Sequence, residues 1–147
     1  ANKKLVGKSP AVILQAADLN TSTAPRLIIV EVEQDDPLVM VEQLMPVLPV
    51  VRVRDFETGL ALALKVENDQ HHTAIMHSQN VSRLNLAAKT MQTSIFVKNG
   101  PSYAGLGIEA EGFTTFTIAT PTGEGTTSAR SFARKRRCVL TNGFSIR

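Results

Sequence analysis

Two apolar runs in the first half of the chain have the pattern of strands. Residues 26–32 read RLIIVEV, a continuous β-branched run that is typical of a strand covered on both faces. Residues 47–53 read VLPVVRV. Pro49 lacks the amide proton that a central strand donates, so this second run is predicted to be an edge strand or to start irregularly near Val47.

Three segments with apolar residues at helical spacing each follow a residue whose side chain can accept a hydrogen bond from a free amide at a helix start. These capping residues are Ser9, Asp55 and Asn80. The helices that they begin are predicted to run from Pro10 to about Leu19, over residues 56–67, and from Val81 to about Met91.

Shorter apolar segments alternate with these helices. Residues 73–77 (TAIMH) and 95–97 (IFV) are each predicted to form a strand, whereas residues 38–46 (LVMVEQLMP) fit either a short helix or extended chain. Because strands alternate with helices of ordinary length, the order predicts an α/β fold with a largely parallel sheet flanked by helices.

The last third of the chain has a different composition. Residues 111–130 are rich in Thr, Gly and Phe, and are too apolar for a linker and too rich in glycine for a plain pair of strands. A helix is predicted around residues 127–135 and a last strand near residues 137–141. We expect the glycine-rich backbone before them to line a site.

The composition is that of an ordinary globular domain. Hydrophobic residues make up 43% of the 147 residues, charged residues 20%, and the net charge is +3. No apolar run approaches the about 20 residues that span a bilayer, and the basic start of the chain is not a convincing signal peptide. A single cysteine excludes an intramolecular disulfide and weakly favours a reducing, cytoplasmic setting.

Three adjacent motifs resemble the C-terminal end of the CoA-acylating aldehyde dehydrogenases. They are SIFVKNGPSYAGLG at 94–107, the segment 111–130 with its GFTTFT core, and SFARKRRCVLTNGFSIR at 131–147. The resemblance ranks the acetaldehyde enzymes of ethanolamine utilisation first and the propionaldehyde enzymes of propanediol utilisation second. It implies that residues 1–136 are the C-terminal part of a catalytic domain, and that residues 137–147 are an oligomerisation strand and tail.

The same resemblance implies the reaction. Acetaldehyde, CoA and NAD⁺ would give acetyl-CoA and NADH, with propionaldehyde as the alternative substrate. In that chemistry a cysteine thiolate adds to the aldehyde, hydride passes to the nicotinamide, and CoA releases the thioester. In the family, that cysteine and the cofactor domain lie before the part matched here. No catalytic residue is therefore assigned, and this chain is expected to be inactive alone. A homo-oligomer, in the cytoplasm or in a bacterial microcompartment, is implied.

Glu42 is the main candidate for a cofactor contact. It lies in the segment Glu42-Gln43-Leu44-Met45-Pro46, directly before a predicted strand. In aldehyde dehydrogenases a Glu at this place binds the nicotinamide ribose, since a carboxylate can accept from two neighbouring hydroxyls. By the same resemblance, Leu44 takes the position of an aromatic residue that packs beside the nicotinamide. Without the resemblance, Glu42 reads as an ordinary solvated residue.

Phe113, Thr114 and Phe116 are the candidate lining of the aldehyde pocket. In the resembled enzymes this region approaches the aldehyde tunnel, whose apolar walls admit a small substrate. The alternative is plain core packing, with Thr used for its preference for strands.

Three other features invite a functional interpretation that the sequence does not support. The histidines, His71, His72 and His77, match no zinc spacing, so no metal is expected. The glycine-rich segment 123–127 lacks the Lys-Ser/Thr of a phosphate loop, and is predicted to be a tight turn. Cys138 lies in a strand-like run, and is predicted to be buried or interfacial and structural.

The basic run at residues 134–137 keeps two further functions open. It could join the last strand in pairing with another subunit, which would make the chain an assembly module. It could instead bind nucleic acid, but no aromatic residue is interleaved with it and no nucleic-acid-binding fold surrounds it. The resemblance implies small aldehydes and CoA as partners, and we expect neither nucleic acid nor a membrane.

Overall fold

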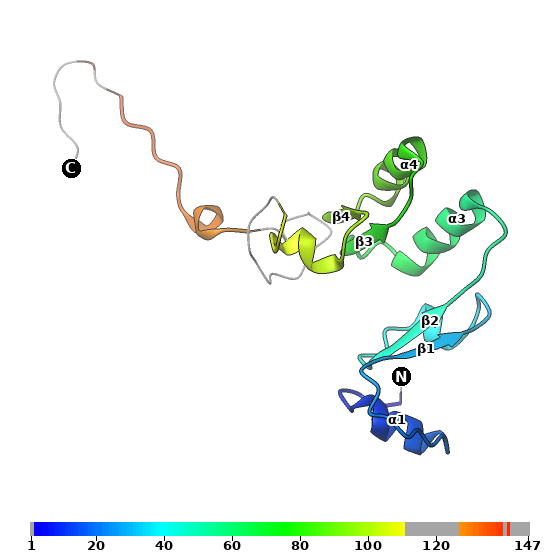
Figure 1. Ribbon diagram of the computed structural model, residues 1–147. Coiled ribbons are helices and arrows are strands. Elements are labelled where there is room, and N and C mark those ends of the chain that lie inside the picture. The colour runs from blue at the N-terminus through cyan, green and yellow to red at the C-terminus, as the bar shows by residue number, and fades with distance from the viewer. Residues whose placement is uncertain (1, 111–126, 140, 142–147) are drawn as a thin grey trace. The chain divides into compact units, whose positions relative to one another are not determined.

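The computed structural model describes residues 2–110, 127–139 and 141. The chain divides into two compact units, residues 1–68 and 69–147. Each unit contains a pair of parallel strands and at least one helix (Figure 1). The predicted α/β fold is therefore confirmed, with two small sheets among the described residues.

The first unit carries one parallel strand pair. Strand β1 (Ile28–Glu31) pairs with β2 (Val47–Val50) so that Ile28 lies opposite Val47. The helices of this unit are α1 (Pro10–Ala16), α2 (Pro37–Met40) and α3 (Phe56–Glu67). In the ambiguous segment 38–46, residues 38–40 belong to the helix α2, and residues 41–46 form an irregular turn rather than extended chain.

The second unit has the same kind of strand pair. Strand β3 (Thr73–Met76) pairs in parallel with β4 (Ile95–Lys98), and α4 (Val81–Met91) connects them. Two 3₁₀ helices follow, η1 (Ser102–Leu106) and η2 (Ala129–Phe132). The buried apolar side chains of the described residues are Leu84, Ala87, Met91 and Val97. One side of α4 therefore packs as part of this small core, whereas Val81 at its start is 65% exposed.

The helix starts at Asp55 and Asn80 are confirmed. The Asp55 carboxylate accepts a 2.7 Å hydrogen bond from the Thr58 amide, and the Asn80 side-chain oxygen accepts a 3.0 Å bond from the Arg83 amide. Ser9 precedes α1 but makes no such side-chain bond, and α1 ends at Ala16, before the predicted Leu19. Local capping therefore fixes α3 and α4 more firmly than α1.

We expect Asp55→Ala to destabilise the protein by about 1 kcal/mol, because the Thr58 amide loses its acceptor at the start of α3. The midpoint of urea unfolding measures this loss. Asp35→Ala is the matched control, since Asp35 is exposed and caps no helix in the described chain. Equal midpoints for the two variants would contradict the capping role.

The prediction that the first strand is covered on both faces is wrong for the described residues. Ile28 and Val30 are half-buried, whereas Ile29 is 66% exposed and its neighbour across the pair, Leu48, is 48% exposed. Burial alternates along β1 because one face of the strand pair is left uncovered within the described part of the first unit. The apolar pattern indicates that both faces of the strand are suited to burial, but it does not indicate which element would pack against each face.

The C-terminal part departs from the predicted elements. The sequence predicts a helix over residues 127–135, but only the four-residue η2 forms there. Ser128 and Ser131 cap it with a reciprocal pair of hydrogen bonds. Phe132 at its end is 81% exposed, so no apolar contact extends the helix. Residues 134–139 form neither helix nor strand. A strand at 137–141 is therefore absent from its described residues.

None of the described helices has the length and apolar character that a membrane span requires.

Candidate functional site

The segment between α2 and β2 presents Glu42 on the surface. Glu42 is exposed, and its Oε1 accepts a 2.9 Å hydrogen bond from the backbone amide of Leu44. A carboxylate has about four acceptor positions, and this bond uses one of them. Within the described residues, the remaining acceptor positions of this carboxylate are open to receive hydroxyl groups. Such a held, exposed carboxylate can bind a diol, which is the chemistry that the resemblance implies for Glu42.

Leu44 occupies a backbone conformation that is unusual for its residue type. Its φ is 51°, in the left-handed region, and its side chain is 66% exposed. For a residue other than glycine this conformation costs about 1 kcal/mol or more. Two backbone hydrogen bonds hold it, one from the Leu44 amide to Glu42 and one of 3.0 Å from the Gly7 amide to the Leu44 carbonyl. The exposed side chain of Leu44 is therefore presented by a constrained turn.

The predicted aldehyde pocket lies outside the described residues. Phe113, Thr114 and Phe116 all belong to the undescribed segment 111–126, as does most of the glycine-rich segment 123–127. Their assignment therefore stays a prediction.

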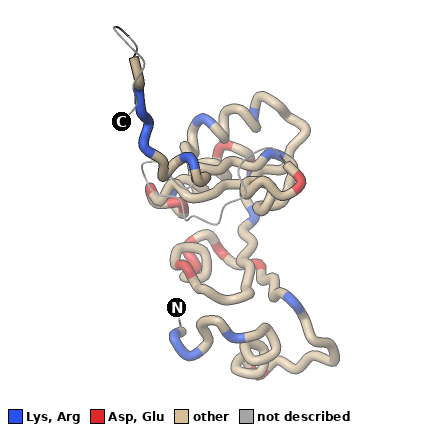
Figure 2. Tube along the Cα trace, turned by 90° about the vertical axis from the view of Figure 1, so that its left-hand side faces the viewer, with Lys and Arg blue, Asp and Glu red and all other residues tan. Residues whose placement is uncertain are grey.

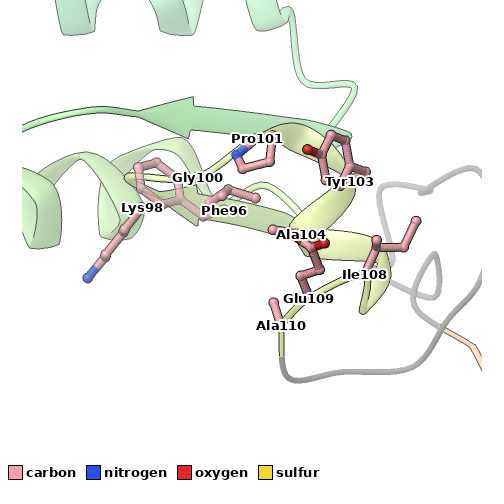
Figure 3. Close-up of a pocket in the computed structure, with 11 residues that line it drawn as sticks. Phe96, Lys98, Gly100, Pro101, Tyr103, Ala104, Ile108, Glu109 and Ala110 are labelled. Carbon is pink, nitrogen blue, oxygen red and sulfur yellow. The ribbon is translucent and has the colours of Figure 1, made fainter.

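A hollow that the sequence did not predict lies in the second unit. It has a volume of about 430 Å³, within the range of about 300–1,000 Å³ that is common for small-molecule sites. Strand β4 and η1 form it together with the residues that follow η1 (Figure 3). Its lining residues are Phe96, Val97, Lys98, Gly100, Pro101, Tyr103, Ala104, Gly105, Ile108, Glu109 and Ala110. The one feature of the sequence that could have pointed to this hollow is the Gly-Pro step at 100–101, because such a step turns the chain directly after the strand.

The polar groups of this hollow are few. The Lys98 side chain extends away from Tyr103 and Ile108 (Figure 3), and its Nζ donates a 2.6 Å hydrogen bond to Asn85 Oδ1 on α4. Tyr103 contributes a phenol and Glu109 a carboxylate, and both residues are exposed. Largely apolar walls with a few polar groups suit a small, mainly apolar ligand.

A second, smaller hollow lies at the carboxyl ends of β1 and β2. It measures about 250 Å³ and is lined by Glu31, Val32, Glu33 and Arg52. Ligands of parallel sheets often bind at this end of the strands. Here, however, the Arg52 guanidinium already binds both carboxylate oxygens of Glu31, at 2.6 and 3.1 Å. The arginine is thus engaged in an exposed ion pair, and we assign no ligand to this hollow.

The histidines show no arrangement for a metal. Among the described residues, no group of three or more His, Cys, Asp or Glu side chains could hold a metal ion. His71 Nδ1 lies 3.2 Å from the carbonyl oxygen of Gln92 and is within hydrogen-bond distance of it. This contact links the chain before β3 to Gln92, the residue directly after α4.

Cys138 is exposed, so the prediction that it is buried is wrong for the described chain. The alternative, that it lies at an interface, stays a prediction. The basic residues 134–137 directly before it are also exposed and form a continuous stretch near the C-terminal end of the chain (Figure 2). Because residues 134–139 pair with no strand, the structure leaves this segment without a described partner.

Comparison with known proteins identifies the relatives of this chain. No protein-family model matches the sequence. The CoA-propanoylating propanal dehydrogenase of Salmonella typhimurium is 76% identical over 100% of the chain, which covers 32% of that enzyme. The acetylating acetaldehyde dehydrogenase of the same organism is 52% identical over 96% of the chain, and 30% of that enzyme is covered. The chain thus spans about a third of the length of the curated relatives that it matches.

Solved structures agree with these relatives. The propionaldehyde dehydrogenase of Rhodopseudomonas palustris, solved with bound CoA and an acylated cysteine, matches with a TM-score of 0.85 at 52% identity, over 93% of this chain and 31% of its own. A propionaldehyde dehydrogenase from the fucose utilisation bacterial microcompartment of Clostridium phytofermentans matches with a TM-score of 0.87 at 40% identity, over 99% of this chain and 34% of its own. The resemblance to CoA-acylating aldehyde dehydrogenases is therefore confirmed. The predicted ranking is wrong, since the propanal enzyme is matched at higher identity than the acetaldehyde enzyme.

Proposed function

We propose that this chain forms about a third of an NAD-dependent, CoA-acylating aldehyde dehydrogenase, and that the whole protein prefers propanal to acetaldehyde. The observation that carries the proposal is the identity of 76% to a propanal dehydrogenase over the full length of the chain, against 52% for an acetaldehyde dehydrogenase. The overall reaction is aldehyde, CoA and NAD⁺ to acyl-CoA, NADH and a proton.

In this proposal the chain supplies binding groups and not the nucleophile. Cys138 is the single cysteine of the sequence and is exposed in a segment without helix or strand. A reactive thiolate needs a site that holds it close to the aldehyde and beside donors for the oxyanion. The thiolate would come from the part of the relatives that this chain does not match.

Glu42 and Leu44 are proposed as the cofactor contacts. The Glu42 carboxylate would accept hydrogen bonds from the hydroxyls of the nicotinamide ribose, and the exposed Leu44 side chain would pack beside the nicotinamide ring. The support is geometric, because both side chains are exposed on one short turn and the Glu42 carboxylate is held by the Leu44 amide. A held carboxylate loses less conformational freedom when it binds the cofactor.

For the aldehyde, we propose the segment that contains Phe113, Thr114 and Phe116 as part of the pocket wall. The hollow beside β4 and η1 could supply further apolar surface, because its lining ends at Ala110, directly before this segment in sequence. An acyl group that is one methylene longer gains about 0.8 kcal/mol when it is buried. Propanal and acetaldehyde therefore differ enough in apolar area for such a wall to separate them.

The test is a comparison of substrates with the whole protein. We expect NADH formation that requires both CoA and aldehyde, with kcat/KM for propanal above that for acetaldehyde by roughly 3- to 10-fold, as one buried methylene allows. A ratio of 1 or less would contradict the propanal preference. NADH formation without CoA, with a free acid as product, would contradict the acylating reaction. Aldehyde-dependent NADH formation by the 147-residue chain alone would contradict the view that the thiolate lies elsewhere.

Assembly and location belong to the same proposal. We propose that residues 137–147 add a strand to another subunit of a homo-oligomer, since a strand needs a partner edge and residues 137–139 have none in the described chain. Light scattering of the whole protein with and without residues 137–147 tests this, and an unchanged number of subunits would exclude it.

For location we propose a bacterial microcompartment, because the Clostridium phytofermentans relative belongs to one. The cytoplasm is the alternative.

A further inference from the structure

Between the two proposed cofactor contacts lies a buried amide. Gln43 is 9% exposed, although Glu42 and Leu44 on either side of it are exposed. A glutamine is rarely buried unless its polar atoms find partners, because desolvating an unpaired amide costs free energy. The burial of this side chain therefore needs an explanation in its contacts.

The Gln43 side-chain amide donates two hydrogen bonds to backbone carbonyls, one in α2 and one directly after it. Its Nε2 donates one hydrogen bond of 2.6 Å to the Val41 carbonyl and another of 3.1 Å to the Pro37 carbonyl. Pro37 is the first residue of α2, and its carbonyl also accepts a 3.1 Å bond from the Val41 amide. The side-chain amide thus ties the start of α2 to the residue directly before Glu42.

On the outer side, the same turn is held through Leu44. The Leu44 amide donates to the Glu42 carboxylate, and the Leu44 carbonyl accepts from Gly7. These bonds are exposed or local, so water can replace the one to the carboxylate at small cost. The two bonds of Gln43 are partly buried, and water cannot replace them without opening the turn.

We infer that Gln43 is a positioning residue for the nicotinamide cofactor, which acts by fixing the turn that presents Glu42. This rests on the proposed role of Glu42. The amide needs both of its N–H groups for two carbonyls, so neither an apolar residue nor a carboxylate of similar size can replace it. Gln43 touches no cofactor in this proposal, and its effect on binding passes entirely through the place of the Glu42 carboxylate.

The test is a double-mutant cycle in the whole protein. Gln43→Met keeps the length of the side chain and removes both donors. We expect it to raise the dissociation constant for NAD⁺ about tenfold, with less than a twofold change in KM for CoA. In a Glu42→Gln background, we expect the same Gln43→Met change to weaken NAD⁺ binding by less than twofold, because the group that it positions is already lost.

Gln15→Met is the matched control, since Gln15 is exposed on α1, and it should leave NAD⁺ binding unchanged. An equal loss of affinity from Gln43→Met in both backgrounds would mean a general structural role and would overturn the inference. If Glu42→Gln weakens NAD⁺ binding but Gln43→Met does not, the inference fails and the proposed function stands. If Glu42→Gln has no effect, the cofactor role of Glu42 fails and the inference with it.

A second variant keeps the test decisive if Gln43→Met does not fold. Gln43→Asn retains the amide but is one methylene shorter, so it can reach one of the two carbonyls and not both. We expect an intermediate loss of NAD⁺ affinity that again disappears in the Glu42→Gln background. Additive losses in this cycle would overturn the inference in the same way.

Discussion

Replacing Glu42 by Gln in the whole protein is expected to weaken NAD⁺ binding at least about tenfold. A hydrogen bond to a charged group contributes about 1.5–3 kcal/mol, and the proposed contact has two. Glutamine keeps the size of the side chain but offers one acceptor oxygen in place of two, so it cannot receive both hydroxyls of a ribose. The Leu44 amide would also lose a charged acceptor, which loosens the turn.

The measurement is the dissociation constant for NAD⁺ by calorimetry, together with KM for CoA and for propanal. Glu33→Gln is the matched control, because Glu33 is exposed and the change in charge is the same. A loss of affinity in Glu42→Gln alone would separate a direct contact from a general effect of charge. Equal dissociation constants for wild type and Glu42→Gln would remove Glu42 from the cofactor site.

The parts of the fold that sequence predicts best are those fixed within a few residues. The side chains of Asp55 and Asn80 each accept a hydrogen bond from an amide three residues later. The start of each helix is therefore fixed by a local contact that does not depend on distant elements. The end of α1 shows the opposite case. The apolar pattern predicts that the helix continues past Ala17 and Asp18. The chain instead turns at Asp18, where φ is 57°, and the helix stops before it.

The parts that sequence predicts poorly depend on partners. The sequence predicts that Ile29 on β1 is buried, but the side chain is exposed. An apolar run indicates that a strand is suited to burial, but it does not indicate which element packs against it. A strand at residues 137–141 has the same difficulty, since β-structure exists only where an edge is available to pair. These two segments differ from α3 and α4 in the range of the interactions that they require.

For the candidate site the division is similar. The resemblance implies a cofactor role for the carboxylate of Glu42, but nothing in the sequence predicts the burial of Gln43 beside it. An amide between two polar or exposed neighbours reads as surface, and its bonds to Pro37 and Val41 exist only once α2 has formed. The hollow beside β4 is likewise a product of packing, because it requires η1 to lie against the strand.

The closeness of that packing leads to the second large effect. We expect Gly105→Ala to destabilise the protein by about 1–3 kcal/mol, the usual cost of an atom forced into a packed region. A methyl group at Gly105 would overlap Cγ2 of Ile95 and would lie 3.4 Å from Cγ2 of Val97. The Ile95 side chain is branched at Cβ, so its Cγ2 methyl cannot rotate away freely and η1 would have to move from β4.

Gly100→Ala is the matched control, because its methyl group would meet Val97 Cγ1 at 3.3 Å, which a shift of a few tenths of an ångström relieves. Urea unfolding should rank the variants as wild type, Gly100→Ala and Gly105→Ala in order of falling midpoint. The cause can be isolated with Ile95→Ala, which removes the overlapping methyl. Adding Gly105→Ala to that background should cost clearly less than it does in the wild type. An equal cost in both backgrounds would show that the overlap is not the cause, and that η1 tolerates a side chain at Gly105 without moving from β4.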